Sequence, residues 1–409
     1  MKLIFLNRYF HPDTSATSQM LSDLAFHLAS QGAEVHVITS RQRYDDASAG
    51  LAAREHSRGV TIHRVATTRF GRSWLPGRAL DYLSFYATSA FALIRLARKG
   101  DVVIAKTDPP LLGVPAGVVA RLRGAHLVNW LQDVFPEIAA RTGLRFAQGL
   151  PGAAIRALRN WSLRAAACNV VLGTRMHSEL RSLPGLASTS FRVIHNWADG
   201  EACTPRADGA PPLRSAWDLA GKFVVAYSGN MGRAHEFDTI LAAAERLRER
   251  RDVVFLFIGG GHQLPWIIRQ ASERNLPNIR FQPYQPREQL GESLGLADVH
   301  LTCLQPALEG LMVPSKIYGI LASGRATLHV GDLDGEIASI LGEARAGYTV
   351  GVGDAEGLAR RIEALKSDPV LRATLGANAR AAFDTHYASG IAFPRWAEVL
   401  RTASGRRPT

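Results

Sequence analysis

Cysteine is scarce in this chain of 409 residues, which contains three. Cys168, Cys203 and Cys303 are odd in number, far apart and in no metal-binding spacing. This pattern argues against disulfides and zinc and favours a reducing compartment. Met1 and Lys2 run directly into an apolar strand pattern that is too short for a signal peptide. We therefore expect a cytoplasmic protein.

The chain also lacks an apolar run long enough to cross a membrane. The strongest candidate, 80–97, has thirteen uncharged residues between Asp81 and Arg95, short of the roughly 20 that span a bilayer. Two interpretations stay open for this segment: a core helix of the first domain, or a helix that lies in the membrane surface. The basic and aromatic residues that favour the second are Arg69, Arg72, Trp74, Arg78, Tyr82, Phe85, Tyr86, Arg98 and Lys99. The arginines that extend this basic face, or else form a solvated helix surface, are Arg141, Arg145, Arg156, Arg159 and Arg164.

Lysine is rare as well, with six lysines against 42 arginines, although the net charge is +12. Such an excess indicates an anionic partner, such as nucleic acid, anionic lipid or nucleotide-sugar phosphates, unless it reflects an arginine-rich coding bias. A nucleic-acid-binding protein would gather its arginines on one face with interleaved aromatics. Here the arginines are scattered over both halves of the chain. We therefore expect no nucleic-acid partner and keep that class as an alternative.

Short apolar strand patterns alternate with helical patterns along the whole chain. The first set occupies 1–200, a stretch rich in proline, glycine and aspartate lies at 198–221, and a second set occupies 201–385. This order predicts two Rossmann-like α/β domains with parallel sheets, in which ligands bind beyond the carboxyl ends of the strands. The loops that follow strands are therefore the candidate sites.

One stretch, residues 313–324, predicts a phosphate site. Pro314 prevents a helix before it, Ser315 is a suitable N-cap, and Gly324 ends the helix. Lys316 then lies in the first turn, where free backbone amides and the helix dipole already favour an anion. The alternative is an ordinary helix start with a solvated lysine.

Other loops after strands carry weaker signals. At 227–233, glycines allow close backbone approach and Arg233 offers a fork suited to phosphate oxygens, and the glycine turn at 258–261 follows the next strand in the same way. At 129–137, Asp133 and Glu137 have a spacing that suits a base or a clamp on a substrate hydroxyl, with a helix cap as the alternative for Asp133. The polar loop 7–18 follows the first strand.

Four motifs together resemble a known family. They are TyrPheHisProAspThrSerAlaThrSerGln (9–19), TrpLeuGlnAspValPheProGlu (130–137), TyrSerGlyAsnMetGlyArg (227–233), and ProSerLysIleTyr with AlaSerGlyArg (314–325). With them, almost the whole chain is similar to bacterial family 4 glycosyltransferases of the GT-B fold, nearest the branch with N-acetyl-fucosamine transferases of capsule and O-antigen assembly. The resemblance implies a nucleotide-sugar donor in the second domain and an acceptor in the first. It also implies that a last segment, 386–409, returns to the first domain as a helix, and that transfer is retaining and needs no metal.

Residue by residue, the resemblance implies that Arg233 and Lys316 hold the donor diphosphate and that Asp133 lies beside the reacting sugar. The donor-binding candidates are Ser228, Gly229, Asn230, Gly260, Pro283, Tyr284, Glu309, Ser315 and Lys316, and the acceptor-side candidates are Thr14, Ser15 and Glu137. One departure stands out, because many members carry two glutamates where this chain has Leu311 and Gly319. Glu309, two residues from the first of these positions, is the candidate substitute.

We therefore expect a glycosyltransferase at the inner face of the cell membrane. It would move a hexosyl or N-acetylhexosaminyl group from a UDP-sugar to a polyprenyl-linked saccharide in surface polysaccharide assembly, without a cofactor or metal. AspLeuAsp at 332–334 has a metal-binding spacing, but it directly precedes a predicted helix, so we interpret Asp334 as an N-terminal cap or dipole partner. An epimerase of the same fold that uses a UDP-N-acetyl sugar is the alternative enzyme.

Overall fold

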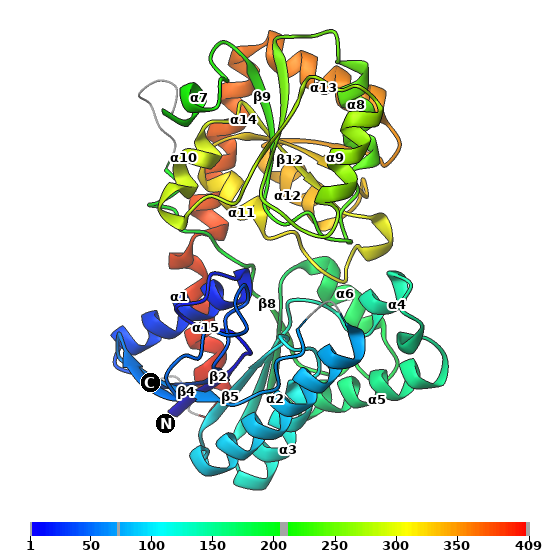
Figure 1. Cartoon of the computed structure of the whole chain (residues 1–409). Helices are drawn as coiled ribbons and strands as arrows, with labels where there is room; N and C mark the ends of the chain where they lie inside the picture. The colour runs from blue at the N-terminus through cyan, green and yellow to red at the C-terminus, as the bar shows by residue number, and fades with distance from the viewer. Residues whose placement is uncertain (1, 72–73, 205–211, 406–409) are drawn as a thin grey trace. The chain divides into compact units, whose positions relative to one another are not determined.

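The computed structural model describes residues 2–71, 74–204 and 212–405. The chain divides into two compact units, the first made of Met1–His195 and Phe393–Thr409 and the second of Asn196–Ala392. Each unit contains its own largely parallel sheet with helices packed on it (Figure 1). The predicted fold class, two Rossmann-like α/β units, is confirmed. Part of the predicted linker, 205–211, lies outside the described residues, as does Arg72.

The first unit is built on an eight-stranded sheet in the order β3-β4-β2-β1-β5-β6-β7-β8. Its strands are β1 (Lys2–Leu6), β2 (Glu34–Ser40), β3 (Arg54–Ser57), β4 (Val60–Val65), β5 (Val102–Lys106), β6 (His126–Trp130), β7 (Cys168–Val171) and β8 (Phe191–Val193). All neighbours are parallel except β3, which pairs antiparallel with β4. The sequence did not predict β3, because its four residues, Arg-Glu-His-Ser, have no apolar alternation.

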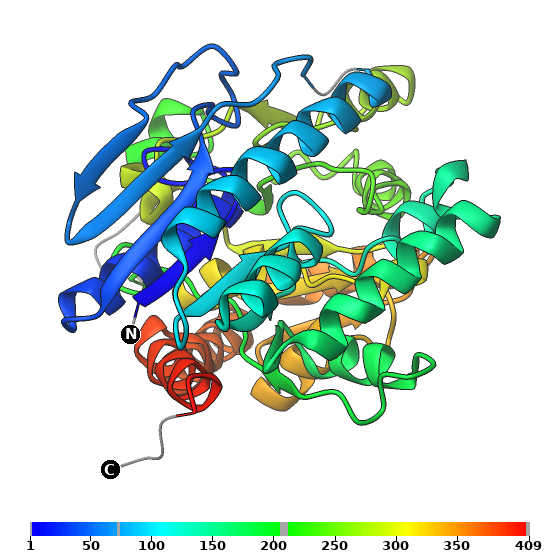
Figure 2. The ribbon, with the colours of Figure 1, turned by 90° about the horizontal axis from the view of Figure 1, so that it is seen from below.

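Helices cover both faces of this sheet. They are α1 (Ala16–Ser30), α2 (Leu75–Leu96), α3 (Gly113–Arg123), α4 (Glu137–Arg141), α5 (Gly149–Ala165), α6 (Thr174–Ser182) and the part of α15 (Ser389–Ala403) that follows Ala392. Phe85 and Leu93 of α2 pack with alternate strand residues such as Ile4 and Val103. On the opposite face, Trp396 of α15 lies 4.6 Å from Trp130 between ring centroids. Figure 2 shows α2, α3 and α5 following one another around one side of the unit.

The second unit has a six-stranded, fully parallel sheet in the order β11-β10-β9-β12-β13-β14. Its strands are β9 (Phe223–Ser228), β10 (Val253–Ile258), β11 (Ile279–Gln282), β12 (Val299–Cys303), β13 (Ala326–Val330) and β14 (Gly347–Val350). Its helices are α7 (Pro212–Ala216), α8 (Asp238–Arg246), α9 (Leu264–Glu273), α10 (Leu290–Gly295), α11 (Lys316–Ala322), α12 (Glu336–Ala344), α13 (Ala355–Ser367) and α14 (Pro369–Ala382). The central strands are buried along their length, as their continuous apolar runs predict.

Two helices begin earlier than the sequence pattern indicates. The helical pattern of 155–167 corresponds to α5, which begins at Gly149; its first turn, Gly-Leu-Pro-Gly, has the composition of a loop, so this start is not evident in the sequence. Segment 80–97 is the larger part of α2, which begins five residues earlier at Leu75. Within the described residues, no helix is both long enough and apolar enough to cross a bilayer.

Candidate functional site

In the second unit, two neighbouring strands end in glycine loops that are joined by backbone hydrogen bonds. The Gly229 amide, after β9, donates to the Ile258 carbonyl over 2.8 Å, and the Met231 amide donates to the Gly260 carbonyl over 2.7 Å. Gly259 has φ +131°, and a Cβ there would lie 2.3 Å from the Gly229 carbonyl oxygen. A side chain would separate the loops, so this close backbone approach depends on glycine.

The side chain of Lys316 reaches the first of these loops. Its Nζ lies 3.5 Å from the centroid of the Tyr227 ring, and a Cβ on Gly229 would lie 3.8 Å from the same nitrogen. Nζ is buried and has no hydrogen-bond partner in the part of the chain that the structure describes. Burial lowers the pKa of Lys316 to about 7, while the nearby Cys303 thiol acts in the opposite direction. A buried cation without a partner is costly, so this arrangement suits an anion bound beside Gly229.

The helix that carries Lys316 is formed as the sequence predicts. α11 begins at Lys316 with Ser315 in the N-cap position, and Gly324 follows its end with φ +61°. The Ser315 hydroxyl makes no capping hydrogen bond. Its side chain is therefore not required to hold the helix start.

Tyr284 lies against the second glycine loop. Cβ atoms built on Gly259 and Gly260 would lie 3.2 and 3.1 Å from its ring, and its hydroxyl donates to the Gly260 carbonyl over 3.3 Å. The side chain is nevertheless 59% exposed, and Pro283 beside it is exposed too. An exposed ring that lies against a glycine turn is suited to stacking on a planar group.

The remaining candidate residues of loop 227–233 differ in their exposure to solvent. The Ser228 hydroxyl is buried without a hydrogen-bond partner among the described residues. Asn230 and Arg233 are exposed, and the guanidinium of Arg233 forms no ion pair within the described residues. The structure thus places Ser228, Gly229 and Lys316 around one point, with Tyr284 at the neighbouring loop.

Glu309 has a structural partner that the sequence did not reveal. Its carboxylate accepts the Glu336 backbone amide over 2.8 Å, at the first residue of α12, and burial raises its pKa. The interpretation of Asp334 as the cap of this helix is wrong, because the N-cap position is Gly335 and the capping carboxylate comes from Glu309. The Asp332 carboxylate instead accepts the Asp334 amide over 3.0 Å. A donor-binding role for Glu309 stays a prediction.

The two positions where the resemblance implies glutamates contain no polar side chain. Leu311 is fully buried, and a Cβ on Gly319 would lie 3.3 Å from Leu294. No carboxylate can therefore reach a ligand from either position.

Sequence reasoning missed two residues beside Lys316. Tyr227 places its ring under the ammonium group, and its hydroxyl donates to the Asn230 carbonyl over 3.0 Å. His235 is buried with Nδ1 at 2.8 Å from the Cys303 carbonyl, and burial, aided by the Lys316 charge, lowers its pKa to about 3. Both residues lie in or next to the glycine motif 227–233, so their position at the end of β9 and after it could have identified them as site residues.

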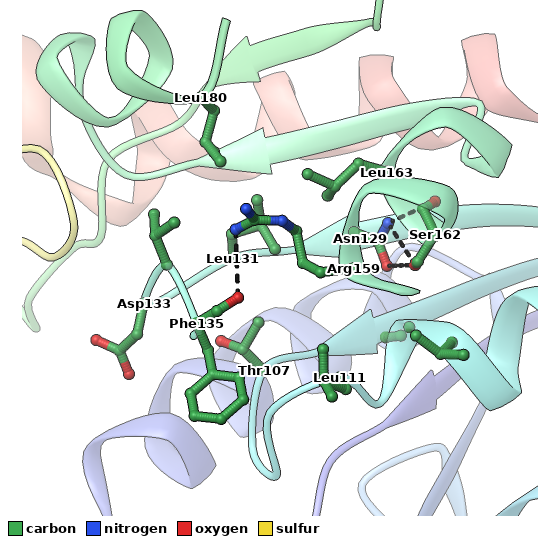
Figure 3. A pocket seen from close by; sticks show the side chains of 14 residues that line it. Thr107, Leu111, Asn129, Leu131, Asp133, Phe135, Arg159, Ser162, Leu163 and Leu180 are labelled. Carbon is green, nitrogen blue, oxygen red and sulfur yellow. Dashed lines mark hydrogen bonds between the residues drawn. The ribbon is translucent and has the colours of Figure 1, made fainter. Parts of the chain in front are cut away.

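In the first unit, Asp133 lies at the edge of a small pocket (Figure 3). The pocket, of about 30 Å³, is lined by Leu131, Leu163, Asn129 and Arg159 among others. Figure 3 shows the Asp133 carboxylate turned away from Arg159. This volume is enough for about one water molecule and not for a sugar, so a larger ligand would bind against the rim, where Asp133 lies.

The electrostatic environment of Asp133 suits a proton acceptor. Loss of solvent around it raises its pKa to about 6, with a contribution from Asp108 and an opposing one from Lys106. The residue keeps an exposed surface, so Asp133 remains accessible at the rim of the pocket. Lys106, at the end of β5, is buried against the Trp130 ring and donates to the Thr17 carbonyl over 2.9 Å. Its burial lowers its own pKa.

The other acceptor-side candidates are engaged in local interactions. Glu137 forms a two-point ion pair with Arg159, with distances of 2.7 and 3.1 Å, so both of its oxygens are occupied. The Ser15 hydroxyl donates to the Asp13 carboxylate, whereas Thr14 is exposed. Asp133 is therefore the best available acid or base among these candidates, and the roles of the others stay predictions.

Comparisons with known proteins agree with this arrangement. Residues 16–197 match the family model "Glycosyl transferase 4-like domain", and residues 213–382 match "Glycosyl transferases group 1". The chain is 27% identical over 305 residues to the probable glycosyltransferase WbjE of Pseudomonas aeruginosa, covering 75% of each chain. It is 28% identical over 339 residues to the putative colanic acid biosynthesis glycosyl transferase WcaI of Escherichia coli K12, covering 79% of this chain and 82% of that protein. Among solved structures, Anabaena HepE in complex with UDP and glucose superposes with a TM-score of 0.75 at 16% identity, covering 98% of this chain and all of that one.

Proposed function

Because the chain belongs to the glycosyltransferases of the GT-B fold, we propose that it transfers a sugar from a UDP-sugar to a polyprenyl-linked saccharide. The second unit binds the donor and the first unit binds the acceptor. The observation that carries this proposal is the buried ammonium group of Lys316 beside Gly229, which has no hydrogen-bond partner among the residues that the structure describes. An anionic ligand at this point would offset the cost of burying the positive charge.

The donor diphosphate lies against Gly229, where Lys316 and the exposed Arg233 supply positive charge. Negative charge develops on the diphosphate as the bond to the sugar breaks, so a fixed cation there stabilises the transition state more than the ground state. Tyr284 stacks on the base. The uridine base is supported by the fold neighbour HepE, which was solved with UDP and glucose.

In the first unit, Asp133 accepts a hydrogen bond from the acceptor hydroxyl that attacks the sugar. Transfer is retaining and needs no metal, as the resemblance implies. A saccharide acceptor is in keeping with the name of the relative WcaI, a putative colanic acid biosynthesis glycosyl transferase. The acceptor's polyprenyl chain places the enzyme at the inner face of the membrane, and an N-acetyl sugar such as N-acetyl-fucosamine is the first donor to test.

Thermal shift and product analysis test the proposal together. Addition of UDP is expected to raise the melting temperature, because a ligand that binds the folded state alone stabilises it by mass action. Lys316→Ala is expected to abolish this rise and to lower the transfer rate about a hundredfold. Incubation with a UDP-N-acetyl sugar is expected to label an added polyprenyl-linked acceptor. A sugar that changes configuration without an acceptor would identify an epimerase instead.

A further inference from the structure

Helix α2 has a buried face and, opposite to it, an exposed apolar face. Gly77, Asp81, Phe85, Ser89 and Leu93 recur every fourth residue and form its buried face. An exposed set, which we name the α2 stripe, follows helical spacing on the other side and consists of Leu80, Leu83, Ala87, Phe91 and Ile94. Leu83 is 60% and Phe91 56% exposed. Single exposed apolar residues are ordinary on a protein surface, but a continuous stripe marks a contact surface.

The neighbouring helices continue this surface. α3 exposes Val118 and Leu122, and α5 exposes Leu150 and Leu158. Figure 2 shows that α3 and α5 follow α2 on the same side of the first unit. Together α2, α3 and α5 contain seven arginines, of which Arg159 is buried and paired with Glu137, and one acidic residue, Asp81, which is buried and paired with Arg8. This side of the unit is therefore both apolar and basic.

The positive charge of the chain belongs to the first unit. Its residues include 28 lysines and arginines against 13 aspartates and glutamates, a net charge of +15, whereas the second unit has 20 against 23, a net charge of −3. The arginines are scattered along the sequence, as noted above, but the excess over acidic residues is confined to one unit. An anionic partner of extended size is thus expected on the first unit.

A groove runs beside the α2 stripe. It has a volume of about 580 Å³, is lined mainly by small and apolar residues of β4 and α2, and shares Ala87 and Phe91 with the stripe. Arg95 lines it with its guanidinium carbon 3.9 Å from the centroid of the Phe91 ring. The volume lies within the range of small-ligand sites. The groove is apolar apart from His63, Thr88 and Arg95. Such a groove beside an apolar stripe suits one hydrocarbon chain with an anionic head group on the arginine.

We propose that the α2 stripe and its groove form a contact surface for an anionic lipid bilayer, with one lipid chain in the groove and its phosphate on Arg95. This inference deepens the proposed work on a polyprenyl-linked acceptor and rests on it. The stripe enters the interfacial region of the bilayer, while arginines around it meet the lipid phosphates.

The structure changes the residues assigned to this surface. The sequence suggested Arg78 and Arg159 as part of the basic face. Arg159 is buried and paired with Glu137, so it does not belong to this face, whereas Arg78, which donates to the Tyr82 hydroxyl over 2.8 Å, stays a prediction. The apolar stripe, with Arg95 at its edge, is the better candidate.

Sedimentation with vesicles tests the inference on the full chain. The stripe variant combines Leu83→Ser with Phe91→Ser, and the matched control combines Leu333→Ser with Val370→Ser, which are 64% and 76% exposed in the second unit. The wild type and the control are expected to sediment with vesicles of phosphatidylcholine and phosphatidylglycerol and to bind poorly to phosphatidylcholine alone. The stripe variant is expected to partition at least about tenfold less, and Arg95→Gln about fivefold less.

Three results would overturn the inference. They are a wild type that does not sediment with the anionic vesicles, a stripe variant that sediments as the wild type does, and a stripe variant that changes only the oligomeric state by light scattering, which would assign the stripe to a second copy of the chain. The UDP-induced thermal shift is measured on the same variants. A wild type without that shift would contradict the proposed donor site while leaving the vesicle result intact, so the two failures are distinguishable.

Discussion

Replacing Lys316 is expected to stabilise the free protein while it removes donor binding. The ammonium nitrogen is buried without a hydrogen-bond partner among the described residues, and the pKa of Lys316 is lowered to about 7. An unfolded lysine titrates at about 10.4, so at pH 7 the fold loses about 4 kcal/mol by holding this group, less about 1 to 2 kcal/mol returned by the Tyr227 ring. Lys316→Met is therefore expected to raise the free energy of unfolding by about 2 to 3 kcal/mol at pH 7.

The lowered pKa of Lys316 determines how the stability of the wild type changes with pH. Between about pH 7 and the unfolded pKa, the unfolded chain binds one more proton than the folded chain, so the wild type gains stability as pH rises through this window. Below pH 7 both states are protonated, and the penalty is complete and constant. Lys316→Met is expected to lose this rise, which denaturant titrations at pH 7 and pH 9 would measure.

Donor binding has the opposite dependence. In the proposed donor site, UDP binds the charged form of Lys316, whose fraction in the free protein falls from about nine-tenths at pH 6 to about one-tenth at pH 8 for a pKa of about 7. UDP affinity is thus expected to fall about tenfold between these values, with uptake of a proton above pH 7. Isothermal titration calorimetry in two buffers of different ionisation enthalpy counts that proton. Lys316→Arg, which stays charged, is the control and is expected to lose the dependence.

Equal UDP affinity in wild type and Lys316→Met, together with no proton uptake, would refute the assignment of Lys316 as the diphosphate-binding cation. A stability lower than that of the wild type in Lys316→Met would refute the inference that the buried ammonium is uncompensated.

Other changes are expected to separate the remaining roles. Asp133→Asn should lower turnover and change UDP affinity by no more than about twofold, because it removes a proton acceptor without touching the diphosphate site. The wild-type kcat should fall below about pH 6, because the carboxylate of Asp133, with its raised pKa, becomes protonated there. Loss of UDP binding in a folded variant would contradict this placement. A chelator should leave the transfer rate largely intact, and Asp332→Asn with Asp334→Asn should affect stability more than rate; activity that is abolished by the chelator and restored by manganese would show a metal-dependent mechanism. Asp81→Asn should lower the free energy of unfolding by about 3 to 5 kcal/mol in a urea titration, because it breaks the buried pair with Arg8; a change below about 1 kcal/mol would show that the pair contributes little.

The sequence alone predicted the architecture because local patterns determine it. Continuous apolar runs such as 253–258 gave buried parallel strands, and helices alternated with them at regular spacing. The helix start at Lys316 also followed from local chemistry, since Pro314 and Gly324 limit that helix whatever packs around it. The glycine loops at 229 and 259–261 could also be predicted from the local sequence, because glycines directly follow a strand pattern at both places.

Tertiary structure alone decided which side chains were free to act. In the sequence, Glu309 and Glu137 are candidates as good as Asp133. In the folded protein, Glu309 accepts a hydrogen bond from the first turn of α12, and Glu137 forms an ion pair with Arg159. It likewise leaves the Lys316 ammonium over the Tyr227 ring, without a hydrogen-bond partner among the described residues. These outcomes depend on contacts between residues far apart in the chain. Local sequence carries the spacing of side chains along one element, whereas the balance of desolvation, charge pairing and hydrogen bonding at a site is set by the neighbours that the fold brings to it.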